Sequence, residues 1–446
     1  MRVAIRAGTR GCVTARVDDI GGRPAVVVEI DPTDRKGALS SDDGESIAIA
    51  AHIALAERIP LVGYIASSGA DIVEGMAALH GWGLAARALA DCSGIVPVVL
   101  AVTGPAVSGP ALLLGLADLV VMTADSYAFV SGPTMVTEFT GVRIDSNELG
   151  GAHVHARHTG AASIVVDGVE AAAAMIELLL AYLPAHADEA PPRWPTDDPP
   201  DRLTPEAGEL LPDASTGSYD VRSVIEAIVD DRDLVELRAR WAPNLVTGLA
   251  TVAGQPVGIV ANQPLAIAGT LDIPSSQKGA RFVGFCDAFN LPIITLVDTS
   301  GFYPGKDLEW RGMIRHGAQL AFAYARATVP RICIILRKSY GGAYIVMDSK
   351  KMGNDLCLAW PTAELAVMGA KGAIEILHRR ATPEERAPLE ADYEARMLNP
   401  FVAAERGYVD AVIEPSATRA EIAHALAMLD SKQESLVGRK HDNSPL

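Results

Sequence analysis

The sequence VPVVLAVTGPAVSGPA at residues 96–111 returns in pattern as VPRICIILRKSYGGAY at residues 329–344. Both stretches open with Val-Pro, continue as a run of aliphatic residues, and then reach a glycine-containing turn. A short apolar run bounded by Gly and Pro predicts a buried strand, and the small residues after the turn predict the start of a helix. Because this strand, turn and helix occur twice at an offset of 233 residues, they indicate a duplicated α/β chain.

Other segments repeat with nearly the same spacing. The sequence IPLVGYIASSGA at residues 59–70 matches LPIITLVDTSGF at residues 291–302, at an offset of 232 residues. The further matched glycines are Gly37 with Gly269 and Gly132 with Gly369. Any two α/β halves share glycines after strands, but here order and spacing both hold, which favours tandem duplication. β-branched runs alternate with Ala-rich stretches, so we expect layered α/β domains with largely parallel sheets.

A proline- and acid-rich segment, PAHADEAPPRWPTDDPPDRLTPEAGELLP, separates the two halves at residues 184–212. It has no hydrophobic period, which is typical of a linker or a surface excursion. We therefore expect four parts. They are an N-terminal domain at residues 1–183, a linker at 184–218, a C-terminal domain at 219–430 and a polar tail at 431–446.

The composition is apolar and acidic, with 49% hydrophobic residues and a net charge of −17. So many apolar residues exclude a disordered chain, and the charge argues against nucleic acid or an anionic membrane as a partner. The five cysteines form no C-x-x-C pair, and the most apolar stretch, 95–122, is interrupted by Gly and Pro. We expect no zinc ribbon, no disulfide framework, no signal peptide and no membrane span, and therefore a cytoplasmic location.

The chemistry that these turns suggest uses backbone groups. The N–H groups at a helix start have no intrahelical acceptor, so they can stabilise an oxyanion such as the enolate of a thioester. One such turn serves packing equally well, whereas two equivalent turns suggest two facing oxyanion sites. No Ser-His-Asp, H-E-x-x-H or P-loop pattern occurs, and the histidine cluster His153, His155 and His158 lacks the spacing of a metal site, so no metal is expected.

The second half carries a resemblance to a known family. DTSGFYPGKDLEWRGMIRHGAQLAFAYARATVPRICIILRKSYGGAYIVM at residues 298–347 and AWPTAELAVMGAKGAIEILHRR at residues 359–380 resemble the carboxyltransferase (β) subunits of biotin-dependent acyl-CoA carboxylases, of the acetyl-/propionyl-CoA carboxylase type. The likeness covers nearly the whole chain and is looser in the first half. It implies two tandem crotonase-like (ClpP/crotonase) domains related by internal duplication.

The resemblance also implies an activity and partners. Such enzymes transfer a carboxylate from carboxybiotin, carried by a biotin carboxylase/biotin carrier α subunit, to the α-carbon of an acyl-CoA. Biotin itself would act as the base, and backbone N–H groups would hold the enolate and the ureido oxygen. Family members pair the first domain of one subunit with the second domain of another inside a hexamer, so a homo-oligomer is expected.

Site residues follow by matching the family motifs. The resemblance places the second-half oxyanion site at Gly342 and Ala343, beside Gly341, and the first-half oxyanion site at Ser108 and Gly109. It assigns Ile345 to the acyl pocket, where an apolar residue suits a short acyl group, acetyl or propionyl. The biotin-side loops are Gly301, Phe302, Gly369 and Ala370. The remaining substrate-binding residues are Gly37, Ala38, Ser68, Gly69, Ala70, Gly132 and Pro133.

The first half departs from the family pattern at three places. Pro110, which has no N–H, follows Gly109, so an oxyanion site that uses residues 109 and 110 would be broken. Asp71 stands where the family has an arginine near CoA, and Arg35-Lys36 stands where the family has Phe-Gly. These two basic residues either contact the CoA phosphates or belong to a solvated loop.

Relative to family members, this sequence also starts later and lacks most of their N-terminal helical extension. The departures leave open two alternatives to an active homo-oligomer. One is a catalytically weak structural paralogue within a mixed complex of β subunits. The other is a carboxyltransferase for a non-standard acyl acceptor.

Overall fold

The computed structural model describes residues 4–5, 11–212, 214 and 217–445. The chain forms two compact units, each of which is described by itself below. The first unit comprises Met1–Pro192, Arg238–Trp241 and Ala288–Asn290, and the second comprises Arg193–Leu237, Ala242–Asp287 and Leu291–Leu446.

The first unit is a mixed sheet with helices. Its strands are β1 Ala4–Ile5, β2 Val13–Ile20, β3 Arg23–Ile30, β4 Ala38–Leu39, β5 Leu61–Ser67, β6 Gly69–Ala70, β7 Val98–Val107, β8 Leu119–Thr123, β9 Tyr127–Phe129 and β10 Ile164–Val166. Its helices are α1 Ser41–Glu57, α2 Met76–Cys92, α3 Gly109–Leu113, α4 Pro133–Thr140, α5 Ser146–Gly150, α6 Ala152–Val154 and α7 Gly168–Ala181.

The second unit repeats this plan. Its strands are β11 Val235–Leu237, β12 Leu245–Val252, β13 Gln255–Asn262, β14 Ile293–Thr299, β15 Arg331–Tyr340, β16 Leu356–Ala359, β17 Glu364–Ala366 and β18 Ala411–Val412. Its helices are α8 Pro205–Glu209, α9 Val221–Ile228, α10 Ile273–Ala288, α11 Lys306–Trp310, α12 Met313–Arg326, α13 Gly341–Val346, α14 Ala370–Leu377, α15 Pro383–Tyr393, α16 Pro400–Glu405 and α17 Thr418–Leu429.

The strand order is the same in both units. In the first it is β1-β2-β3-β5-β7-β8-β10, with β9 paired to β7; in the second it is β11-β12-β13-β14-β15-β16-β18, with β17 paired to β15. β2 and β3 form an antiparallel hairpin, as do β12 and β13, and the strands that follow pair in parallel. The prediction of a duplicated α/β chain with largely parallel sheets is therefore confirmed.

Backbone conformation supports the same duplication. Arg58 and Asn290 both adopt left-handed backbone, with φ of 55° and 56°, at positions 232 residues apart. Ser108 and Gly341, in the turns after β7 and β15, also have positive φ, at 61° and 62°. Because a positive φ costs a non-glycine residue of order 1 kcal/mol, its presence at both Arg58 and Asn290 supports an equivalent turn in the two units.

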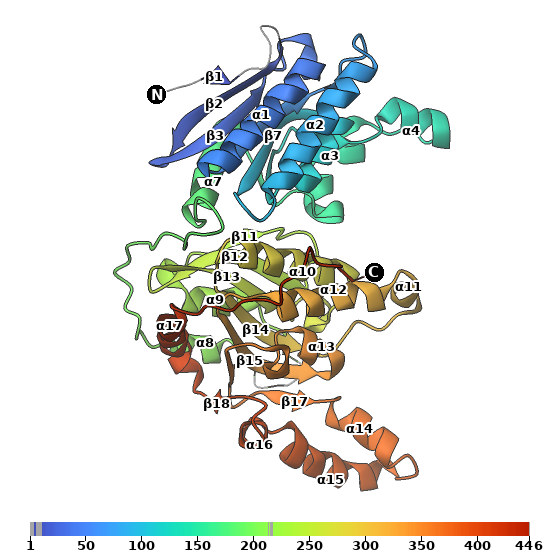
Figure 1. Ribbon diagram of the computed structural model, residues 1–446. Coiled ribbons are helices and arrows are strands. Elements are labelled where there is room, and N and C mark those ends of the chain that lie inside the picture. The colour runs from blue at the N-terminus through green and yellow to red at the C-terminus, as the bar shows by residue number, and fades with distance from the viewer. Residues whose placement is uncertain (1–3, 6–10, 213, 215–216, 446) are drawn as a thin grey trace. The chain divides into compact units, whose positions relative to one another are not determined.

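Packing in the first unit depends on a close helix crossing. Figure 1 shows α1 and α2 side by side over the sheet, and their residues join the β-strand side chains in one core. The helices approach closely because Gly44 and Gly81 face one another, and a Cβ on Gly81 would lie 2.6 Å from the carbonyl oxygen of Ser41. A capping box of Ser40 and Asp43 begins α1.

Helices pack around the sheet of the second unit. α8, α9 and α17 supply one apolar layer, and α10 and α12 contribute buried side chains elsewhere in the unit. The segment expected to be a linker, 184–218, lies partly within this unit: Ala207 of α8 is fully buried in its core. The N–H of Thr204 donates to the carbonyl oxygen of Ser416, which ties this proline-rich segment to the sequence before α17.

Within the part of the chain that the structure describes, every helix is too short or too polar to cross a membrane.

Candidate active site

The turn after β15 is the part of the second unit that the sequence singled out. Gly341 begins α13 with a φ of 62°, and no side chain caps this helix. The next two residues, Gly342 and Ala343, are in the first turn of α13, where N–H groups have no intrahelical acceptor. The end of β15 is anchored to β14. The buried carboxylate of Asp298 in β14 accepts hydrogen bonds from Arg337 Nε at 3.0 Å and from Lys338 N–H at 3.2 Å.

The loop of Gly301 and Phe302 lies beside this turn. The N–H of Leu271 donates to the carbonyl oxygen of Gly301 at 3.0 Å, which anchors the loop. The Phe302 ring packs on Gly342, since a Cβ on Gly342 would lie 3.3 Å from Phe302 Cε2. The structure thus brings together the turn predicted to bind an oxyanion and one of the two predicted biotin-side loops.

The second predicted loop reaches the same turn through Tyr340. A Cβ on Gly369 would lie 3.5 Å from the Tyr340 ring, and Ala370 begins α14 as a buried residue. Burial, together with the hydrogen bond to Glu364, raises the pKa of the Tyr340 phenol, so its hydroxyl stays protonated and donates to that carboxylate. Ile345 lies one turn further along α13 and is 42% exposed.

The equivalent turn in the first unit differs in its donors. Ser108 has a φ of 61° and is followed by Gly109 and Pro110 at the start of α3. The N–H of Ser108 already donates to the carbonyl oxygen of Phe129 at 2.9 Å. The N–H of Ser108 is therefore not free for an oxyanion, and because Pro110 has no N–H, Gly109 carries the remaining backbone donor among these three residues.

The predicted substrate loops of the first unit do meet. β4 pairs with β6 so that Ala38 lies opposite Gly69 and Leu39 opposite Ala70. The N–H of Ser68 donates to the carbonyl oxygen of Lys36 at 3.1 Å, next to Gly37. These loops border a cavity of about 190 Å³. It is lined by Leu39, Ala70, Leu79, Trp82, Ser108, Gly109, Pro110, Leu112 and Val130.

Several of these lining residues were not predicted from the sequence. Trp82 and Leu79 come from α2, Leu112 from α3, and Val130 from the end of β9. Of these, only Trp82 carries a sequence signal, as an aromatic residue between two glycines within an Ala-rich helix. The predicted residues Gly132 and Pro133 do not line this cavity; they begin α4 two residues beyond Val130.

Asp71 has a partner that the sequence alone did not reveal. Its carboxylate forms a short ion pair with the guanidinium of Arg35, and it accepts a hydrogen bond from Val73 N–H at 3.0 Å. Arg35 also lies 3.5 Å from the carboxylate of Asp43. Asp71 and Arg35, two departures from the family pattern, therefore neutralise one another. Lys36 is a second exposed basic residue of this loop.

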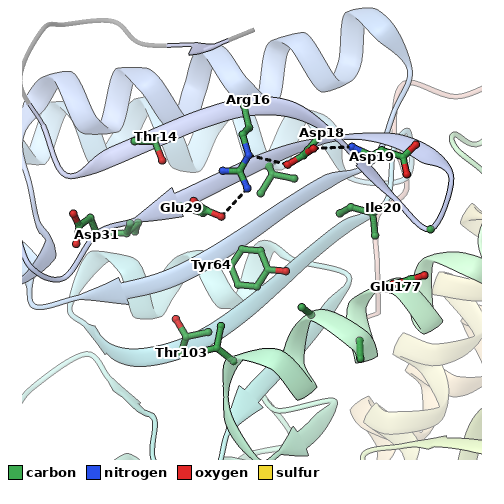
Figure 2. A pocket seen from close by; sticks show the side chains of 16 residues that line it. Thr14, Arg16, Asp18, Asp19, Ile20, Glu29, Asp31, Tyr64, Thr103 and Glu177 are labelled. Carbon is green, nitrogen blue, oxygen red and sulfur yellow. Dashed lines mark hydrogen bonds and ion pairs between the residues drawn. The ribbon is translucent and has the colours of Figure 1, made fainter. Parts of the chain in front are cut away.

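The first unit also has a larger hollow, of about 840 Å³, on the sheet face formed by β2, β3 and β5. Figure 2 shows Arg16 bonded to Asp18 and Glu29 above Tyr64, with the carboxylates of Asp31 and Glu177 at its edges. Asp19 also lines it, so carboxylates outnumber the one guanidinium. None of the predicted site residues lines it, and its charge opposes a CoA phosphate.

Neither the turns nor the cavity carries an obvious general base. Among the described residues, no group of three His, Cys, Asp or Glu side chains could hold a metal ion. His155 of the histidine cluster instead contacts the carbonyl oxygen of Ala128 through Nε2 at 2.8 Å. The arrangement suits chemistry that depends on oriented backbone donors.

Comparison with known proteins gives a consistent answer. The carboxyl transferase domain family matches residues 6–444. The propionyl-CoA carboxylase beta chain of Roseobacter denitrificans is 43% identical over 430 residues, which cover 96% of this chain and 84% of that protein. The biotin-dependent acetyl-/propionyl-coenzyme A carboxylase beta5 subunit of Mycobacterium tuberculosis is 42% identical, covering 96% of this chain and 81% of that one.

Solved structures agree. Transcarboxylase 12S, crystallised with methylmalonyl-coenzyme A and methylmalonic acid, matches with a TM-score of 0.97 and 37% identity over 100% of this chain and 90% of that chain. A single-chain, multi-domain long-chain acyl-CoA carboxylase matches with a TM-score of 0.80 and 30% identity, over 93% of this chain and 41% of that chain. These matches confirm the predicted fold of two tandem crotonase-like domains. The chain belongs to the carboxyltransferase (β) subunits of the biotin-dependent acyl-CoA carboxylases.

Proposed function

We propose that this chain transfers a carboxyl group from carboxybiotin, held on a separate carrier protein, to the α-carbon of a short acyl-CoA. The observation that carries the proposal is the uncapped turn after β15, where Gly342 and Ala343 present backbone N–H groups. Fixed N–H donors of this kind stabilise an oxyanion, and the oxyanion required here is the enolate of a thioester or the ureido oxygen of biotin. Gly109 would present the corresponding donor in the first unit.

The loops around Gly342 fit a biotin ring. A Cβ on Gly301 would meet no heavy atom within 4 Å, so the space beside this glycine is open, and Phe302 offers an apolar face. Carboxybiotin, when bound, supplies the carboxyl group. In this proposal Phe302 orients the ring and excludes water, while Gly301, Gly369 and Ala370 allow close approach of the backbone.

The first unit would hold the acyl-CoA. The apolar cavity next to Gly109 can take the apolar part of the ligand, and Ala70 lines it. Gly37, Ala38, Ser68 and Gly69, in or next to the paired strands β4 and β6, are proposed to contact the ligand beside the cavity. Gly132 and Pro133 are proposed to lie further along the ligand, since Val130 lines the cavity and they do not. The phosphates of CoA are negatively charged, so an acidic protein can bind them only where basic side chains lie nearby. Lys36 is an exposed basic residue close to these strands, and we propose it as a phosphate contact.

We also propose that the working enzyme is a hexamer built from dimers, together with a biotin carboxylase/biotin carrier α subunit. Large apolar side chains are exposed on α4 and near α14, including Phe139 at 92% exposure and Val367 at 76%. Such surfaces are typical of interfaces between subunits. A cytoplasmic location is consistent with five cysteines that are all buried and unpaired.

Acetyl-CoA and propionyl-CoA are the acceptors that we propose. Ile345, which the family motif places at the acyl pocket, is apolar and partly exposed on α13. In Ile345→Ala the added room should raise activity with butyryl-CoA relative to propionyl-CoA by about tenfold, since one methylene group is worth of order 1–3 kcal/mol. Ile345→Val should give an intermediate ratio. An unchanged ratio in both variants would remove Ile345 from the acyl pocket.

The direct test uses the reverse reaction, which does not require the partner subunit. Purified protein is mixed with methylmalonyl-CoA or malonyl-CoA and free biotin, and release of propionyl-CoA or acetyl-CoA is followed. Biotin-dependent release is expected. If neither thioester loses its carboxyl group, and reconstitution with a biotinylated α subunit, bicarbonate and ATP also yields no product, the proposed function is wrong.

A further inference from the structure

The indole N–H of Trp82 is a buried donor with no acceptor among the described residues. Trp82 Nε1 is shielded from solvent, and no hydrogen-bond partner for it occurs in the described part of the chain. Leaving such a group unpaired is unfavourable, because its desolvation is not offset by a hydrogen bond. Trp360 is the contrasting case in this chain, because its Nε1 donates to Thr418 Oγ1 at 2.9 Å.

This donor lies at the first-unit turn. Trp82 lines the 190 Å³ cavity together with Ser108, Gly109 and Pro110. A Cβ on Gly109 would lie 2.5 Å from Trp82 Nε1, so the indole nitrogen sits directly against this glycine. The indole N–H and the backbone N–H of Gly109 are therefore neighbours at the wall of one apolar cavity.

The same turn lacks a donor that its counterpart has. In the second unit Gly342 and Ala343 both carry N–H groups, whereas at the equivalent positions of the first unit Gly109 has one and Pro110 has none. Ser108 does not compensate, because its N–H is bonded to Phe129. One further donor is needed to match the second unit.

We propose that Trp82 supplies that donor: its indole N–H, with the N–H of Gly109, binds the carbonyl oxygen of the ligand that occupies the first-unit cavity. The ligand chemistry is a carbonyl oxygen that gains negative charge. It belongs to the acyl-CoA thioester if the first unit holds acyl-CoA as proposed above, and to the ureido group of biotin if the two ligands occupy the opposite units. The inference rests on the proposed function and adds a catalytic side chain to it. The ring shifts slightly when the ligand enters, and its unpaired N–H then gains the acceptor that the free protein lacks.

Trp82→Phe separates this role from packing, because the phenyl ring keeps most of the apolar contact and removes only the N–H. Carboxyl transfer from methylmalonyl-CoA to free biotin should fall about 100-fold in kcat, as for loss of one oxyanion donor. The thermal midpoint should stay the same or rise, since an unpaired buried donor is lost. Trp360→Phe, which loses a bonded N–H, should lower the midpoint.

Pro110→Ala provides the rescue. This variant restores a backbone N–H at the position where Ala343 has one, so the double variant Trp82→Phe/Pro110→Ala should recover at least tenfold over Trp82→Phe. A structural role for Trp82 would not be rescued by a backbone donor in the next helix.

Binding gives a second readout that does not depend on turnover. Ultraviolet resonance Raman spectra, with the Trp82→Phe spectrum subtracted, report hydrogen bonding of this one indole N–H. Propionyl-CoA and free biotin are added separately, and the one that shifts the band identifies the source of the oxygen. If neither ligand shifts the band, or if Trp82→Phe keeps the wild-type kcat, the role of Trp82 is wrong. Wild-type protein without any transfer activity would instead contradict the proposed function, and the Raman arms would still decide whether Trp82 is a donor.

Discussion

The carboxylate of Asp71 is paired with the guanidinium of Arg35, although each residue by itself departs from the family pattern. The Asp71 side chain is 9% exposed and that of Arg35 is 40% exposed, so the pair lies at the edge of the fold. It joins the loop before β4 to the loop after β6, and these two strands contribute Leu39 and Ala70 to the lining of the first-unit cavity. Asp71 is therefore part of the local structure, and it does not present a free negative charge to CoA.

This pairing predicts a coupling that a double-mutant cycle can measure. Arg35→Gln leaves a mostly buried carboxylate without its cation, so it should lower the free energy of unfolding by about 1–2 kcal/mol. The double variant Arg35→Gln/Asp71→Asn should lose less than the sum of the single variants, with a coupling of about 1 kcal/mol. Denaturant unfolding of the four proteins checks this, and strict additivity would show that the pair contributes nothing.

The crossing of α1 and α2 predicts opposite effects for two nearby glycines. Gly81→Ala should destabilise the first unit by about 1–3 kcal/mol, because the new Cβ would meet the backbone of Ser41. Gly83→Ala is the matched control, since nothing lies within 4 Å of a Cβ there and the residue is within the same helix. It should stabilise by about 0.5–1 kcal/mol through helix propensity. The thermal unfolding midpoints of the two variants and the wild-type protein test this prediction. Equal shifts in Gly81→Ala and Gly83→Ala would mean that the two helices do not pack as described.

The buried thiols predict a dependence on pH. Burial, with a contribution from Asp43, raises the pKa of Cys12 to about 12, and burial with Asp118 raises the pKa of Cys92 to about 12. Both thiols should therefore resist alkylation at pH 8 until the protein unfolds. Since unfolded thiols ionise near pH 9 and these do not, stability should fall between about pH 9 and pH 12, by roughly 1.4 kcal/mol per pH unit for each thiol.

Mass spectrometry after iodoacetamide treatment checks the first part of that prediction. The variant Cys92→Ala checks the second, because it should lose stability less steeply over the same alkaline range. Rapid modification of Cys12 and Cys92 in native protein at pH 8 would contradict both parts.

The second-unit turn predicts the effect of removing one N–H. Ala343→Pro should keep the fold, because Pro110 occupies the equivalent position in the first unit, within the first turn of a helix. Carboxyl transfer should fall about 100-fold or more through loss of one oxyanion donor. Ala343→Gly keeps the N–H and should retain most activity. Full activity in Ala343→Pro, with an unchanged melting curve in both variants, would exclude this N–H from catalysis.

Local sequence patterns were sufficient for much of this protein. The repeated strand and turn at 96–111 and 329–344 predicted the duplication, because apolar runs and glycine punctuation are set by neighbouring residues. The same patterns located the turns at Ser108 and Gly341, where φ is 61° and 62°. The family motifs then identified the chemistry, since they lie in those turns.

Tertiary structure decided what each polar group at the site can do. The N–H of Ser108 donates to Phe129, Arg35 is paired with Asp71, and the indole N–H of Trp82 has no hydrogen-bond partner among the residues that the structure describes. Each of these facts depends on residues that are distant in sequence and are brought together only when the sheet and helices pack. A hydrogen bond or ion pair requires particular distances and angles, so the sequence names the donors and the folded chain determines which of them remain free for a ligand.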